Sequence, residues 1–110
     1  MPYNYGVLRR ATVEDVEHLA PRLRLIDRIE IEASNLGLLS ALEILLQGLR
    51  VSSPHAWVLC DDETGEPYAL GGVRSYMGGT VGIPWLVGTY ALEERPLQFH
   101  REAKAMLARV

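Results

Sequence analysis

Cysteine is almost absent from this chain of 110 residues, which has only Cys60. A disulfide within the chain, a CxxC redox pair and a cluster of thiolate metal ligands are therefore excluded. Cys60 follows the short apolar run 56–59, so we expect a buried small hydrophobic residue and not a nucleophile. His18 and His55 have no second ligand four residues later, and no metal site is expected.

An excess of basic residues and a long apolar run are also missing. Eleven Lys and Arg against fourteen Asp and Glu leave a net charge of -3, so no positive field attracts a nucleic acid. Arg22, Arg24 and Arg28 alternate with acidic residues, which is typical of a solvated helix face. No apolar stretch has the length of about 18 residues that spans a bilayer, and residues 1–10 lack the run of a signal peptide. We expect no nucleic-acid partner, no membrane span and a cytoplasmic location, unless the protein is packaged in a particle.

The composition is that of a folded protein. Hydrophobic residues make up 48% and charged residues 23% of the chain, which is too apolar for a disordered sequence. A chain of this length supports one hydrophobic core. We therefore expect residues 1–110 to form a single domain.

Local signals predict a strand and two helices in the first half. A strand is expected at 6–11, and Thr12 with Asp15 predicts a helix N-cap with an acid in the first turn. Apolar spacings of three and four carry this helix from about residue 13 into the arginine-rich stretch, where Pro21 must kink or divide it.

A capping box at Ser40 and Glu43, after the loop 34–38, predicts the second helix. The leucines at helical spacing behind it predict its core face. They are Leu42, Leu45, Leu46 and Leu49.

The second half predicts strands and a final helix. Segments 57–60 and 67–76, joined by an acidic turn, indicate a β-hairpin. Gly71 and Gly72 in its second strand indicate a bulge or a close approach of another backbone or a ligand. A third strand is expected at 83–87, interrupted by Pro84, and residues 96–110 have helical spacing.

This order, β-α-α-β-β-β-α, resembles the first two-thirds of the Gcn5-related N-acetyltransferase (GNAT) fold. Leu8–Leu23 (LRRATVEDVEHLAPRL), Ala69–Val73 (ALGGV) and Ile83–Thr89 (IPWLVGT) are similar to segments of small GNAT-like proteins of tailed phages, which are related to a podophage internal virion protein. The resemblance implies an α/β (α+β) domain with a central, mostly antiparallel sheet. The C-terminal strands of the fold are missing, so we expect a domain truncated at Val110.

The resemblance also implies where acetyl-CoA binds. In the GNAT fold the pantetheine arm pairs with backbone groups at the end of the fourth strand, and a glycine-rich turn holds the diphosphate. Residues 89–96 contain no glycine and include Glu93 and Glu94, so we expect a degenerate acyl-CoA site. The cofactor-binding residues implied by the resemblance are Trp85, Leu86, Val87, Gly88 and Thr89.

No catalytic residue is assigned. Proton transfer requires a positioned acid and base, and Tyr76, Tyr90, Glu43 and His100 can each supply one, but none stands in a recognisable motif. For His100 an exposed helix position is the plainer interpretation, and for Trp85 it is a core anchor or an interface residue.

Three functions stay open. The first is a phage-encoded GNAT-fold protein associated with the virion or with DNA ejection, located in the host cytoplasm or packaged, with other virion proteins or a second copy of itself as partner. The second is an active acetyl-CoA-dependent N-acetyltransferase with an unusual cofactor loop. The third is a protein-binding module that uses an uncovered sheet edge or the last helix.

Overall fold

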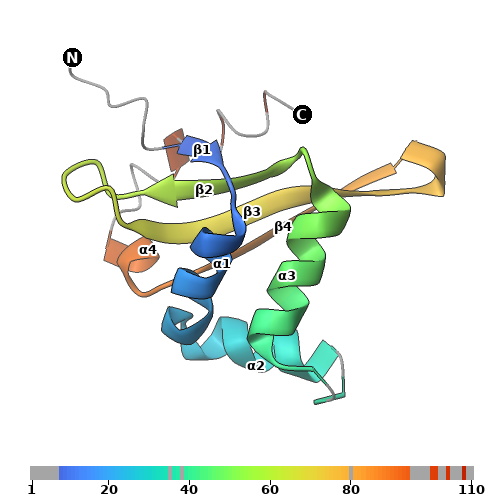
Figure 1. Ribbon diagram of the computed structural model, residues 1–110, viewed down its shortest axis with the longest axis horizontal. Coiled ribbons are helices and arrows are strands. Elements are labelled where there is room, and N and C mark those ends of the chain that lie inside the picture. Colours follow the sequence, from blue (N-terminus) through green and yellow to red (C-terminus); the bar gives the residue numbers. More distant parts are fainter. Residues whose placement is uncertain are drawn as a thin grey trace.

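A computed structural model describes residues 8–34, 36–37, 39–79, 81–94, 100–101, 104 and 108 (Figure 1). The protein is α+β, with an antiparallel sheet, helices between the first and second strands of that sheet, and a short helix after its last strand. The elements are β1 (Leu8–Arg10), α1 (Val13–Leu19), the 3-10 turn η2 (Ala20–Arg22), α2 (Leu25–Ser34), α3 (Ala41–Ser52), β2 (Ala56–Cys60), β3 (Pro67–Tyr76), the 3-10 turn η3 (Met77–Gly79), β4 (Val81–Gly88) and α4 (Ala91–Glu94).

The order of elements differs from the prediction because Pro21 divides the first helix. α1 ends at Leu19, Pro21 lies in η2, and Leu23 is extended with a ψ of 148° before α2 begins. Proline has no N–H to continue the helical hydrogen bonds. The described order is therefore β-α-α-α-β-β-β-α, with three helices before β2 where the sequence predicted two.

Both predicted helix starts are confirmed. The Thr12 side chain accepts a hydrogen bond from the Asp15 N–H, and the Ser40 side chain accepts one from the Glu43 N–H. In each case the acid bonds back to the N-cap backbone, which completes a capping box. The core face of α3 was predicted in part, because Leu45 is buried at 3% exposure while Leu42 is 36% exposed.

The β2–β3 hairpin and the burial of Cys60 are confirmed, and the sheet continues as a meander in the order β1-β2-β3-β4. Gly71 and Gly72 pair regularly with β2, so the predicted bulge is wrong there. The register shift lies at Leu59/Cys60 instead. The other half of that prediction holds, because a Cβ on Gly72 would lie 2.6 Å from the His55 carbonyl oxygen.

Pro84 does not interrupt the third predicted strand, because β4 is continuous from Val81 to Gly88. The N–H and C=O of Gly88 bond to α2 and the preceding loop, away from β3. Alternation along an antiparallel strand gives Leu86, Pro84 and Gly82 the same outward direction. The ladder therefore needs no donor from Pro84, which is where edge strands tolerate proline.

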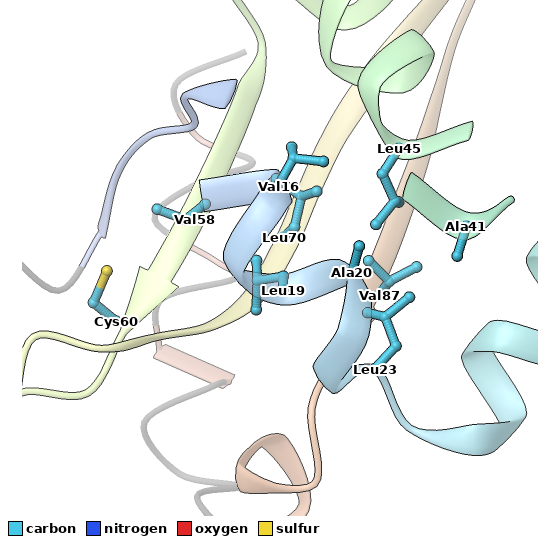
Figure 2. Close-up of a cluster of buried hydrophobic side chains, with 10 residues drawn as sticks. All are labelled: Val16, Leu19, Ala20, Leu23, Ala41, Leu45, Val58, Cys60, Leu70 and Val87. Carbon is cyan, nitrogen blue, oxygen red and sulfur yellow. The ribbon is translucent and has the colours of Figure 1, made fainter. Parts of the chain in front are cut away.

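The main core lies between the sheet and the helices α1 and α3, which pack on the same face (Figures 1 and 2). Its members are Val16, Leu19, Ala20, Leu23, Ala41, Leu45, Val58, Cys60, Leu70 and Val87. A second cluster formed by Leu8, Trp57, Leu59, Tyr68, Ala69 and Leu92 covers the opposite face. Because both faces are apolar, every residue of β2 is buried.

Most of the predicted final helix, 96–110, lies outside the described residues, and His100 is exposed. No helix in the described part of the chain has the length and hydropathy needed to cross a membrane.

Asp15 ties α1 to the sheet and makes stability depend on pH. Its carboxylate accepts two hydrogen bonds from Arg9, at 2.7 and 2.8 Å, and is 5% exposed. Burial acts to raise the pKa of Asp15, but hydrogen bonds from Arg9 and Thr12 outweigh it and hold the pKa below its ordinary value. The stabilisation is then complete above the unfolded pKa of about 3.9 and is lost as the pH falls through the lower folded pKa.

We expect Asp15→Asn to lower the free energy of unfolding by about 1–3 kcal/mol at neutral pH. The difference from the wild type should shrink as the pH falls below about 4, where the wild-type carboxyl protonates. Urea unfolding of both proteins at a series of pH values measures this difference. If the difference in unfolding free energy between the two proteins stayed constant across the acid range, the stabilising role of the Asp15 carboxylate would be contradicted.

Candidate functional site

A large cavity in the described part of the chain lies where β4 meets α2 and α3, and its volume is about 470 Å³. Small-molecule sites fall in the same range of volume. Both apolar and polar groups line it, with acids on α2 and one arginine on β3. The lining residues are Asp27, Glu30 and Ile31 of α2, Ile44, Leu45, Gln47 and Gly48 of α3, Arg74 of β3, and Ile83, Trp85, Leu86 and Val87 of β4.

Trp85 is fixed on the helix face of the sheet next to this cavity. Its indole Nε1–H donates to Ser52 Oγ at 2.9 Å, and Ser52 is only 2% exposed. The ring lies against Gly72 of β3 and Gly48 of α3, where added Cβ atoms would lie 3.1 and 3.5 Å from it. The two glycines therefore make the space that the indole fills.

The end of β4 is joined to the start of α2 by hydrogen bonds on both backbone groups of Gly88. The Gly88 N–H donates to Asp27 Oδ2 at 2.9 Å, and the Arg24 N–H donates to the Gly88 oxygen at 2.9 Å. Asp27 is 7% exposed and also accepts from Arg24 Nε at 3.0 Å. The Asp27 hydrogen bond raises the pKa of Arg24, so Arg24 stays charged.

Three backbone amides that follow β4, those of Ala91, Leu92 and Glu93, are bonded within their own turn. The Ala91 N–H donates to Thr89 Oγ1 at 3.3 Å, and the Leu92 N–H donates to the Thr89 oxygen at 3.0 Å. The Glu93 N–H donates to the Tyr90 oxygen at 3.0 Å. A diphosphate binds to N–H groups that point outward together, whereas these three described amides already have acceptors within the turn.

Charge at this turn argues in the same direction. Arg24 Nη1 donates to Glu93 Oε2 at 3.4 Å, in addition to its bonds with Asp27. The Arg24 guanidinium is thus shared between two carboxylates, and an anionic ligand that used Arg24 would have to compete with both.

The five predicted cofactor-binding residues fall in three different places. Trp85, Leu86 and Val87 line the large cavity. Gly88 is bonded to α2, as described above. Thr89 lines a second cavity of about 290 Å³, together with Tyr68 of β3 and Tyr90.

Of the four residues considered for proton transfer, Glu43, Tyr90 and His100 do not line the large cavity. Tyr90 accepts a hydrogen bond from the Leu25 N–H at 3.1 Å, and His100 is exposed. Hydrogen bonds from Ser40 hold the pKa of Glu43 below its ordinary value, which makes it a weaker base. The side chain of Tyr76 lies outside the described residues.

Sequence reasoning missed Asp27 and Arg24, which it placed on a solvated helix face. Arg22 is exposed, but Asp27 is buried and Arg24 is partly buried beneath Glu93. The i,i+3 spacing of Arg24 and Asp27 indicates an ion pair. No local signal indicates that the N–H of Gly88, 61 residues after Asp27, also bonds to the Asp27 carboxylate.

Comparison with known proteins finds no relative of this chain: no family model, no curated protein and no solved structure matches it. Within the described residues no group of three or more His, Cys, Asp or Glu side chains could hold a metal ion. The features that bear on function are therefore the end of β4, its hydrogen bonds and the cavity beside it.

Proposed function

We propose that this chain is a phage protein of the virion or the DNA-ejection apparatus, which uses a GNAT-like scaffold as a structural or binding domain without acetyltransferase chemistry. The resemblance of Leu8–Leu23, Ala69–Val73 and Ile83–Thr89 to the phage proteins motivates the family and the setting. These segments form β1 with α1, the middle of β3, and β4, which pack around one core. An antiparallel meander behind paired helices is compatible with the first part of that scaffold.

The hydrogen bonding after Leu86 is the observation that supports a role without catalysis. Both outward-facing groups of Gly88, which the resemblance assigns to pantetheine, are bonded to Arg24 and Asp27. The amides of Ala91, Leu92 and Glu93 are bonded within their turn. Binding a coenzyme there would require breaking several of these bonds, each worth about 0.5–1.5 kcal/mol and more where a charge is involved.

We expect isothermal titration of the full chain with acetyl-CoA to give no binding heat at about millimolar cofactor, where a ligand bound by only 4 kcal/mol would half-saturate the site. The physical reason is that the described amides of Gly88 and Ala91–Glu93 already have acceptors and are not free to hold a diphosphate. Saturable binding at low micromolar concentration would favour the active N-acetyltransferase and end the proposal of a degenerate site.

The structural role is tested on particles of the phage that encodes the chain. Quantitative mass spectrometry of purified virions should detect the protein in a fixed ratio to known structural components. Its presence only in the infected-cell lysate, with none in the virions, would contradict a packaged role.

A further inference from the structure

The outer edge of β4 has the geometry of a strand acceptor. In the described part of the chain β4 pairs with β3 alone. Gly88 directs its N–H and C=O away from β3, and by alternation the N–H and C=O of Leu86 and the C=O of Pro84 also point outward. Only Gly88 among these has hydrogen-bond partners within the described residues. An extended chain can therefore pair at Leu86 and Pro84 without displacing any described bond.

The large cavity borders this same edge. Leu86 lies on the outermost strand and lines the cavity together with Trp85 and Val87. Ile31 of α2 lines the same cavity. Every second side chain of an added strand points to the helix face of the sheet. A large apolar side chain on such a strand would enter the cavity and contact the Trp85 indole.

Charge at the cavity mouth indicates the chemistry of the partner. Glu30 is exposed on α2 at the lining, and neither Arg74, which also lines the cavity, nor another described cation forms an ion pair with it. Asp27, the other acid of the lining, is already paired with Arg24. A Lys or Arg on the incoming strand would supply the missing partner of Glu30.

Pro84 argues against a second copy of this chain as the occupant. Two antiparallel β4 edges that pair around their centre would bring Pro84 opposite Pro84 or Leu86 of the other copy. Proline has no N–H, so such pairing loses ladder hydrogen bonds. A foreign strand can place its own residues so that only the C=O of Pro84 is used.

We propose that the edge of β4 and the adjoining cavity bind an extended peptide segment of another protein, which pairs with Leu86 as an added strand, inserts one large apolar side chain beside Trp85 and directs a Lys or Arg to Glu30. The inference goes beyond the proposed virion role and does not depend on it, since it needs only the edge, the cavity and the charge. Absence of the protein from virions would leave it standing, and failure of peptide binding would leave the virion role standing.

A displayed library of random nonapeptides, selected against the full chain, is the probe. The selected peptides should share one large apolar position and a Lys or Arg close to it. A synthetic peptide of the selected sequence is then titrated by fluorescence anisotropy. We expect Gly48→Leu, whose side chain grows into the cavity, to weaken binding about tenfold or more. Gly48→Ala is the matched control and should bind within about twofold, because its Cβ lies at an ordinary contact distance of 3.5 Å from Trp85.

Two further measurements separate strand addition from other modes. Glu30→Gln should weaken binding about two- to fivefold, with the effect reduced by salt. Amide hydrogen exchange of Leu86 should slow when the peptide binds, since its outward N–H becomes bonded. Thermal unfolding of each variant checks that it is folded. The proposal is overturned if selection yields no binder, if Gly48→Leu binds as Gly48→Ala does, if Leu86 exchange is unchanged, or if light scattering shows the edge closed in a dimer.

Discussion

Gly72→Ala is expected to lower the free energy of unfolding by about 2–3 kcal/mol, the cost of overpacking a site that cannot relax. The new Cβ would lie 2.6 Å from the His55 carbonyl oxygen and 3.1 Å from the Trp85 ring. Neither neighbour can move easily, because His55 accepts a hydrogen bond from the Val73 N–H at 2.9 Å and Trp85 is bonded to Ser52. Urea unfolding measures the change.

Gly48→Ala is the control, because its Cβ would contact the same indole from the other side. There the closest approach is 3.5 Å, which is ordinary van der Waals contact. Gly48 lies inside α3, where replacing glycine by alanine favours the helix by about 0.8–1.0 kcal/mol. The two substitutions should therefore change stability in opposite directions. A Gly72→Ala protein as stable as Gly48→Ala would show that the packing around Trp85 is wrong.

Asp27→Ala is expected to cost about 3 kcal/mol, within the range for breaking a buried charged pair. The substitution leaves the buried Gly88 N–H without its acceptor and Arg24 without its closest carboxylate. It should also loosen the contact between α2 and β4, which depends on these bonds and on the Arg24 N–H donated to Gly88. Chemical unfolding gives the loss, and amide exchange of Gly88 should accelerate.

Two variants give this measurement its controls. Asp27→Asn keeps an oxygen that can accept from Gly88 but removes the charge, so its loss should be smaller than that of Asp27→Ala. Glu30→Ala changes an exposed acid one turn later on the same helix and should stay within about 0.5 kcal/mol of the wild type. Equal losses for Asp27→Ala and Glu30→Ala would contradict the buried role of Asp27.

The features that were predicted correctly are local in sequence. The capping boxes at Thr12 and Ser40 depend on a residue three positions away, and the β2–β3 hairpin depends on its own turn. The division of the helix at Pro21 follows from one missing N–H. Such signals need no knowledge of the rest of the molecule.

The features that were missed depend on pairs far apart in the chain. Asp27 and Gly88 are 61 residues apart, and Ser52 and Trp85 are 33 residues apart. Asp27 is buried because the end of β4 lies against it. The spacing of residues along α2 does not predict that contact. Pro84 was read as an interruption because its place at the sheet edge depends on which strands pair.

The candidate site also combines local features, which could be predicted, with long-range features, which could not. Leu86 and Val87 were associated with a binding surface, and both line the cavity beside α2. The other side of that cavity comes from helices whose packing the sequence did not predict, so neither its volume nor the acid at its mouth could be anticipated. The amides after Thr89 belong to a short turn, and their internal bonding became visible only with the backbone in place.

The most direct test of the account is a nuclear magnetic resonance titration of the ¹⁵N-labelled full chain with coenzyme A. It reports on the Gly88 and Ala91–Glu93 amides individually. Because these groups are already bonded to Asp27 and within their turn, we expect their resonances to stay in place up to about millimolar ligand. Saturable shifts of Gly88 and of the turn amides, with faster exchange at Gly88, would mean that the coenzyme displaces those partners and would contradict the central claim.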